Sequence, residues 1–310
     1  MYLLYTSWGH DGLMALRVLV AGIGAALLAW LCLRRGGAPI AVMAAGALAI
    51  FAARPLFNDR PQAVTVPFFV AMLCLIQLAE EGKERWLLIG APLLMIVWVN
   101  IHGGFIYGPA LMGLYAFCKL PGWYRQWRED ADLSPRPGYV AGAIGLTVVA
   151  CLVNPNGLEG AIYPLGYVGG GHTWHQTAIA EYASPDFSEG VFLPLGCLIV
   201  TAMAAFAASG RRASLWDVAL TAVFLYTTLK WQRNMALFAF AVAPVFALHL
   251  SGLLERLTSA IRQPASGSRD SALLHWAIVV VLAVSAIMSF PAASRQTDEA
   301  FRNDMPVECV

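Results

Sequence analysis

The sequence predicts an all-α protein, a bundle of about ten helices that cross a membrane. Of its 310 residues, 59% are hydrophobic and 13% are charged, and the mean hydropathy is +0.64. Soluble domains have about 25% charged residues. The apolar runs reach about 20 residues, the length that a helix needs to cross about 30 Å of hydrocarbon. The alternating pattern of a transmembrane β-barrel is absent, so helices are the expected spanning elements.

Each apolar run is bounded by Arg, Lys, Pro or acidic clusters, and these boundaries place the helices. In chain order, the expected helices cover residues 14–33, 39–53, 62–79, 86–100, 105–119, 138–153, 191–208, 215–229, 234–253 and 273–290.

Lys and Arg divide unequally between the two sets of alternating loops. One set holds Arg34, Arg35, Lys83, Arg85, Lys119, Arg125, Arg128, Arg136, Arg211, Arg212, Arg256, Arg262 and Arg269, thirteen of the 20 cations. The positive-inside rule makes that side cytoplasmic. We therefore expect an inner-membrane, multi-pass protein with both chain ends extracytoplasmic. Residues 1–290 form the membrane domain with a long outer loop at 154–190, and residues 291–310 begin an outer segment.

The net charge and the cysteines exclude few classes of function. A polytopic chain separates its charges by side of the membrane, so the net charge of +1 gives no indication of nucleic-acid binding. None of the six cysteines forms a CxxC pair, and five lie in or at the ends of apolar runs. We interpret them as small hydrophobic residues. The sequence requires no cofactor.

The stretch WVNIHGGFIYG places an amide and an imidazole, Asn100 and His102, between two apolar runs. The simplest interpretation is a tight turn in which Gly103 and Gly104 supply backbone freedom. The charge bias places this turn on the outer face, beside other polar loops. We therefore predict that Asn100 binds substrate and that His102 belongs to a catalytic site.

The outer loop at 154–190 has acidic residues and no Lys or Arg. In EYASPDF, Pro185 forces a turn between Glu181 and Asp186, which we predict to be catalytic acids. An acidic surface could also bind a divalent cation, or could merely follow the positive-inside rule. His172 and His175 have a spacing that suits metal ligands, but solvated loop histidines have the same spacing.

Four cations break the charge rule by lying on the outer side: Arg54, Arg60, Lys230 and Arg233. An unpaired cation near hydrocarbon is costly, so each needs a partner. Contact with lipid headgroups is one explanation. The other is a clamp for a phosphate or diphosphate where these loops meet, and we predict all four as substrate-binding residues.

The runs RPQAVTVPFF, PLLMIVWVNIHGGFIYG, NPNGLEGAIYPL and EYASPDF, followed by an RN-containing helix start, resemble bacterial relatives of the GT-C membrane glycosyltransferases. These are similar to the dolichyl-phosphate-mannose mannosyltransferase group. The resemblance covers the chain from about residue 3 onward. It implies a transferase that takes a sugar from a polyprenyl-phosphate donor on the extracytoplasmic face, with the bilayer as its surroundings.

The chain departs from that pattern at both ends. Relatives begin with a further helix and an acidic, Trp-rich outer loop, which supplies the catalytic carboxylate, and they continue into a further outer segment. We therefore expect an incomplete or inactive copy as one outcome. Two alternatives stay open: a transporter or flippase of lipid-linked or anionic solutes, and a non-catalytic membrane subunit with a protein partner.

Overall fold

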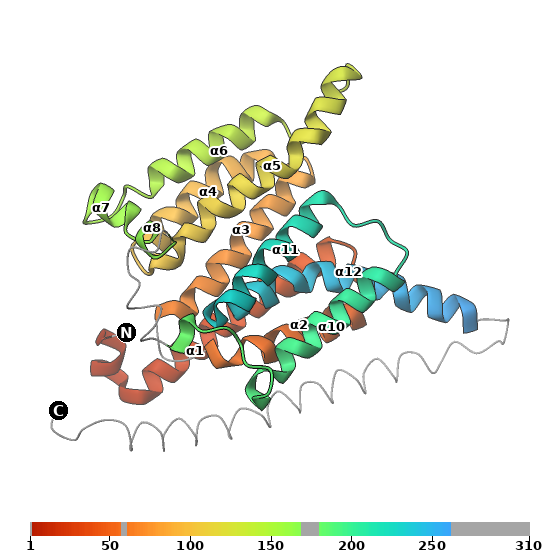
Figure 1. Ribbon diagram of the computed structural model, residues 1–310. Coiled ribbons are helices and arrows are strands. Elements are labelled where there is room, and N and C mark those ends of the chain that lie inside the picture. The colour runs from red at the N-terminus through yellow and green to blue at the C-terminus, as the bar shows by residue number, and fades with distance from the viewer. Residues whose placement is uncertain (1, 57–60, 169–179, 262–310) are drawn as a thin grey trace. The chain divides into compact units, whose positions relative to one another are not determined.

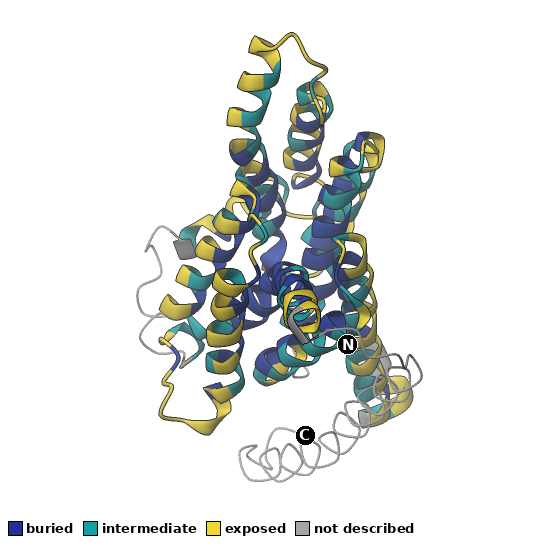
Figure 2. Cartoon of the chain, turned by 90° about the vertical axis from the view of Figure 1, so that its right-hand side faces the viewer, coloured by how far each residue is buried: buried dark blue, intermediate teal, exposed yellow. Residues whose placement is uncertain are grey.

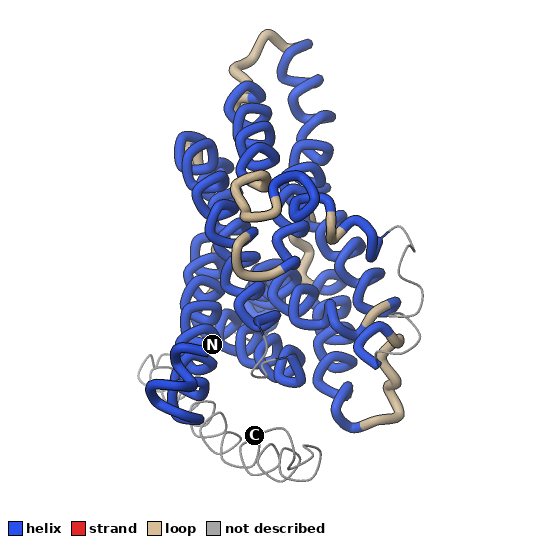
Figure 3. The backbone as a smooth tube through the Cα atoms, turned by 90° about the vertical axis from the view of Figure 1, so that its left-hand side faces the viewer, coloured by secondary structure: helices blue, strands red, loops and turns tan. Residues whose placement is uncertain are grey.

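The computed structural model of the chain describes residues 2–56, 61–168 and 180–261 (Figure 1). Within these ranges the chain is helical, and no residue forms a strand (Figure 3). The all-α prediction is therefore confirmed. The chain separates into two compact units, Met1–Leu257 and Thr258–Val310. The first unit contains every helix up to α11 and most of α12.

The first nine expected helices are present and correspond to α1–α6 and α10–α12. The α-helices are α1 (Tyr2–Arg34), α2 (Pro39–Ala53), α3 (Thr65–Glu80), α4 (Glu84–Val99), α5 (Tyr107–Arg128), α6 (Pro137–Ala150), α7 (Gly157–Ile162), α8 (Leu165–Val168), α10 (Leu193–Ala208), α11 (Leu215–Lys230) and α12 (Met235–Ile261). The 3-10 turns are η1 (Arg54–Leu56), η2 (Pro61–Val64), η3 (Gly103–Ile106), η4 (Ala180–Tyr182), η5 (Gly190–Phe192) and η6 (Gln232–Asn234). The tenth expected helix, 273–290, and the segment 291–310 lie outside the described residues.

Four helical stretches in the described residues are long and apolar enough to cross a membrane. They are Asp11–Arg34, Gln62–Glu80, Gly190–Ala208 and Gln232–Ser259. Helices α2 and α6 are also apolar but shorter. These four stretches are consistent with a membrane protein. The number of ten spans stays a prediction.

The outward face of α4 is apolar as well. Ile89, Leu93 and Val97 are 59%, 59% and 51% exposed, and their spacing of four residues puts them on one side of the helix. The opposite side, with Met95 and Trp98, is buried. Figure 2 shows the same division on other helices, with buried residues on the inner sides. An exposed apolar stripe of this kind suits contact with lipid.

Helix α12 lies at the centre of the first unit. Every residue from Met235 to Ala247 is buried. A helix that is apolar on all sides can be buried on all sides, and the sequence MALFAFAVAPVFA has no polar residue. The other α-helices that the structure describes each have an exposed residue, whereas this stretch of α12 has none.

The loops between the helices gather at two ends of the first unit. At one end, which we call the histidine end, His102 contacts Thr65, and Tyr107 contacts Asn234. At the other, which we call the arginine end, Arg35 forms an ion pair with Asp217, and Lys119 forms one with Glu80. Loops that the sequence assigned to one side of the membrane therefore lie together.

Three boundaries differ from the prediction. Helix α1 begins at Tyr2 rather than near residue 14, with a break at Gly9, whose φ is 58°. Helix α5 continues through Pro121 to Arg128, because loss of apolar character at Lys119 does not end a helix whose next turns are amphipathic. The predicted loop at 154–190 contains α7 and α8. Asn154 starts this segment by donating from Nδ2 to the carbonyl oxygens of Cys151 and Gly157, both at 2.8 Å.

Candidate functional site

Four segments that are far apart in sequence meet at the histidine end. They are the start of α3, the turn from His102 into α5, the stretch from η4 to residue 184, and η6 before α12. The contacts that join them are Thr65 Oγ1 with His102 Nδ1 at 2.9 Å, Tyr107 Oη with Asn234 Oδ1 at 2.6 Å, and Gln232 N with Ala183 O at 2.9 Å. Three predicted site residues, His102, Glu181 and Arg233, lie in these segments.

His102 is held by its Nδ1 atom. The backbone N–H of Gly104 donates to Nδ1 at 2.9 Å, and the Thr65 hydroxyl contacts the same nitrogen. A nitrogen that accepts a hydrogen bond carries no proton, so this network assigns a neutral ring with its proton on Nε2. Within the described residues Nε2–H has no hydrogen-bond partner. The imidazole therefore offers one donor to a ligand.

The surroundings of His102 favour this neutral form. Burial lowers the pKa of His102, and the nearby Arg233 guanidinium lowers it further. Both effects penalise the charged ring, the first by desolvation and the second by repulsion between like charges. His102 is thus suited to donate a hydrogen bond at neutral pH.

Acidification is expected to destabilise the turn that His102 caps. Because its folded-state pKa lies below the unfolded value of 6.5, the neutral ring stabilises the fold above that pH. This contribution is lost as the pH falls from about 6.5 through the folded-state pKa. We expect the melting temperature of the parent to fall relative to that of His102→Asn over this range, because Asn also caps helices but does not titrate. A constant difference between the two proteins would contradict this.

Two contacts fix the position of Arg233, one between its guanidinium and an aromatic ring and one from the backbone of its turn, η6. Its Cζ atom lies 4.5 Å from the centroid of the Tyr182 ring, within the range of a cation–π contact. The N–H of Gln232 donates to Ala183, so η6 is tied to the segment after η4. The structure therefore fixes a guanidinium near the neutral His102.

Tyr107 and Asn234 complete the cluster and were not predicted as site residues. The Tyr107 hydroxyl donates to Asn234 Oδ1, and Asn234 Nδ2 donates to the Thr227 carbonyl at 3.2 Å. Asn234 is buried. These bonds join the start of α5 to the turn between α11 and α12. Both residues belong to motifs quoted above, GGFIYG and RN, and that was the one signal that the sequence offered.

Asn100 has a bracing role in the structure. Its Nδ2 atom donates to the carbonyl oxygens of Ile96 at 2.8 Å and Val153 at 2.7 Å. These bonds close the end of α4 and join it to the chain after α6. The amide nitrogen of Asn100 is therefore engaged with the backbone.

The other predicted cations are more peripheral. Lys230 is exposed, with Nζ 4.4 Å from the centroid of the Trp231 ring. Arg54 is exposed at the end of α2. Arg60 lies outside the described residues. Of the three that the structure describes, Arg233 is the cation that lies near His102.

The two predicted acids differ in their surroundings. Glu181 is half-buried in η4, directly before Tyr182. Asp186 is exposed and accepts hydrogen bonds from Ser188 N at 2.9 Å and Ser188 Oγ at 2.7 Å. These bonds from Ser188 lower the pKa of Asp186. Asp186 therefore organises its own turn, and Glu181 is the acid that adjoins the cluster.

No metal centre is present among the residues that the structure describes, because no three His, Cys, Asp or Glu side chains gather there in a way that could hold an ion. The histidine pair His172 and His175 lies outside the described residues. The divalent cation that the acidic loop allows stays a prediction.

Comparison with known proteins adds no relative: no family profile, no curated protein and no solved structure matches the chain. The resemblance to membrane glycosyltransferases rests on the quoted motifs.

Proposed function

We propose that the chain is a membrane glycosyltransferase that takes a sugar from a polyprenyl-phosphate donor at the histidine end. The observation that carries this proposal is the cluster itself. A fixed cation, Arg233, and an unused N–H donor, His102 Nε2, lie together at the end of a bundle with apolar outer faces. Such a site suits a phosphate at the end of a lipid chain.

The chemistry assigns a role to each side chain. Transfer breaks the bond between the anomeric carbon and the phosphate oxygen, and the electron pair leaves with the polyprenyl phosphate. Arg233 would stabilise this developing charge, and His102 Nε2–H would orient an oxygen of the donor or acceptor. The acceptor hydroxyl forms the new bond and loses its proton to a carboxylate, for which we propose Glu181.

The unequal distribution of Lys and Arg between the loops supports an assignment of the reaction to one side of the membrane. By sequence, thirteen of the 20 cations fall in the loop set that includes Arg35 and Lys119. We therefore propose that the arginine end is cytoplasmic and the histidine end is extracytoplasmic in the inner membrane. Arg54, Arg60 and Lys230 then belong to the outer surface, where they would contact lipid headgroups or the donor phosphate.

Arg233→Ala tests the proposal. Loss of one charge-assisted contact to phosphate costs about 1.5–3 kcal/mol, so we expect binding of polyprenyl phosphate to weaken about tenfold or more. Binding is measured by scintillation proximity with radiolabelled polyprenyl phosphate and the purified protein. Arg85→Ala is the matched control, because Arg85 is an exposed arginine at the start of α4, away from the cluster.

Two outcomes would contradict the proposal. One is a folded parent that does not bind polyprenyl phosphate, and the other is an Arg233→Ala variant that binds as well as Arg85→Ala. Consumption of a polyprenyl-phosphate hexose in proteoliposomes then separates a transferase from the transporter and the non-catalytic subunit, because both of those leave the donor intact.

A further inference from the structure

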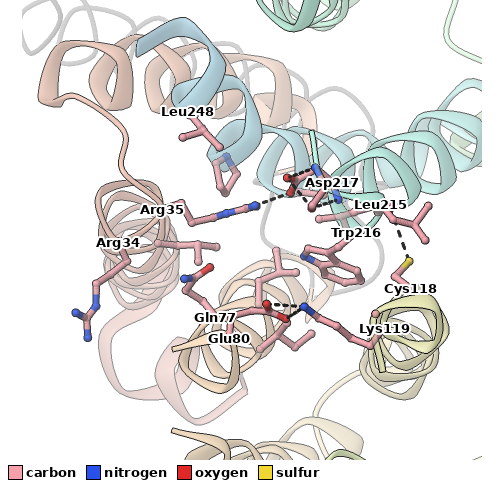
Figure 4. A pocket seen from close by; sticks show the side chains of 18 of the residues that line it. Arg34, Arg35, Gln77, Glu80, Cys118, Lys119, Leu215, Trp216, Asp217 and Leu248 are labelled. Atoms are coloured by element: carbon pink, nitrogen blue, oxygen red, sulfur yellow. Dashed lines mark hydrogen bonds and ion pairs between the residues drawn. The ribbon is translucent and has the colours of Figure 1, made fainter. Parts of the chain in front are cut away.

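A second polar site lies at the arginine end. A cavity of about 830 Å³ opens between the ends of α1, α3 and α5, the start of α11, and the middle of α12 (Figure 4). Its volume falls in the range of small-molecule sites, about 300–1,000 Å³. The residues that set its charge are Arg34, Arg35, Lys119, Arg125, Arg212, Glu80 and Asp217. All of them belong to the first unit.

Both carboxylates of this cavity already have a cationic partner. Asp217 Oδ1 accepts from Arg35 at 2.5 Å, and Oδ2 accepts from the Ser214 hydroxyl at 2.8 Å. Figure 4 shows Arg35 and Asp217 pointing toward each other, and Lys119 pointing toward Glu80. The second oxygen of Glu80 accepts from the Tyr115 hydroxyl. Each carboxylate is therefore already paired with a cation, Asp217 with Arg35 and Glu80 with Lys119.

Two arginines of the cavity have no paired carboxylate among the residues that the structure describes. Arg34 pairs with Glu81 at 3.2 Å and extends away from the cavity centre (Figure 4). Arg125 comes from α5, and Arg212 comes from the loop before α11. Among the described residues neither forms an ion pair or a side-chain hydrogen bond. Two unneutralised guanidinium groups thus line one hollow from two different elements.

Apart from Gln77 and Ser214, the rest of the cavity wall is mainly apolar. Leu31, Leu73, Ile76, Leu220 and Leu248 line it. A cation-rich surface alone would follow from the positive-inside bias, but that bias does not require a hollow with an apolar wall. The combination suits a ligand with an anionic head and a less polar body.

We propose that this cavity binds a phosphate ester through Arg125 and Arg212. Guanidinium groups bind phosphate with paired, charge-assisted hydrogen bonds, and two of them match a dianion. The apolar wall receives the organic part of the ester. The ester is either the headgroup of an anionic lipid, which basic pockets between membrane helices can bind, or a soluble phosphate compound.

The test uses two probes that separate these sources. The first is phenyl phosphate, titrated by calorimetry into the protein in phosphatidylcholine nanodiscs. The second is a fluorescent phosphatidylglycerol, whose enrichment around the protein is measured in the same nanodiscs. Saturable binding of phenyl phosphate assigns a soluble ester, and selective enrichment of phosphatidylglycerol assigns a lipid headgroup. Absence of both overturns the proposal.

Matched variants locate the binding. One of the two probes is expected to bind the parent protein. The double variant Arg125→Gln and Arg212→Gln is expected to bind that probe about tenfold or more weakly, since two charge-assisted contacts are lost. The double variant Arg85→Gln and Arg128→Gln removes the same charge from exposed positions outside the cavity and is expected to bind as the parent does. Equal loss in both variants would overturn the proposal, because it would mean that net charge alone attracts the probe.

Two further measurements complete the design. All four substituted positions are exposed, so the variants should fold, and circular dichroism with size-exclusion chromatography verifies this. The titrations are repeated with Arg233→Ala. Binding that persists in that variant and is lost with Arg125 and Arg212 belongs to this cavity, whether or not the histidine end binds a donor.

Discussion

Asp217→Asn is expected to lower the free energy of unfolding by about 3–5 kcal/mol, the cost of breaking a buried ion pair by removing one charge. Arg35 and Asp217 are 14% and 3% exposed, and their closest atoms lie 2.5 Å apart. The amide can still accept the hydrogen bonds that cap α11, so the loss comes mainly from the uncompensated Arg35. Denaturant unfolding in detergent, followed by far-UV circular dichroism, measures it.

Two comparisons isolate this effect. Glu255→Gln breaks the pair with Arg211, whose partners are 30% and 67% exposed, and is expected to cost at most about 1 kcal/mol. Combining Asp217→Asn with Arg35→Met removes both charges and should recover most of the loss. The interpretation fails if Asp217→Asn costs no more than Glu255→Gln.

Gly104→Ala is expected to damage the histidine end, whereas Gly103→Ala is expected to be tolerated. A methyl group at Gly104 would lie 2.8 Å from Thr65 Cγ2 and 3.0 Å from His102 Nδ1. At Gly103 the nearest atom is Pro164 Cγ at 3.9 Å, an ordinary contact. Overpacking costs about 1–3 kcal/mol, and it would also separate His102 from Thr65.

The two variants form a matched pair because neither glycine has a positive φ, so the difference between them is steric. Melting temperature and binding of polyprenyl phosphate are both measured. We expect Gly104→Ala to lower both and Gly103→Ala to resemble the parent. Equal behaviour of the two would mean that the turn can shift enough to accept a methyl group at either position.

The arrangement of helices was largely predictable because it depends on properties that a single sequence contains. Apolar length and the asymmetry of Lys and Arg placed nine helices and sorted their loops into two ends. The extents of α1 and α5 were not predictable in this way. Their outer turns contain polar residues, such as Thr6 and Ser7 in α1 and Gln126 and Arg128 in α5, so the hydropathy falls before the helix boundary is reached.

The candidate site was predictable only where a residue was unusual by itself. His102 interrupts an apolar run, and Arg233 breaks the charge rule. Apart from the motifs to which they belong, nothing in the local sequence distinguishes Thr65, Tyr107 or Asn234. Their role depends on contacts between residues that are 37 and 127 positions apart, Thr65 with His102 and Tyr107 with Asn234. Arg125 and Arg212 were not predicted as site residues, because Lys and Arg are common in the cation-rich set of loops to which they belong.

The burial of α12 has a consequence for ligand affinity. Arg233 and Asn234 directly precede the thirteen buried residues from Met235 to Ala247. Their backbone is therefore anchored to the most enclosed part of the first unit. A ligand that meets Arg233 would not have to order the segment that bears it, so less conformational entropy would be lost on association than at a free loop. Preorganisation of this kind slows dissociation, and even one cation can then hold a phosphate for longer.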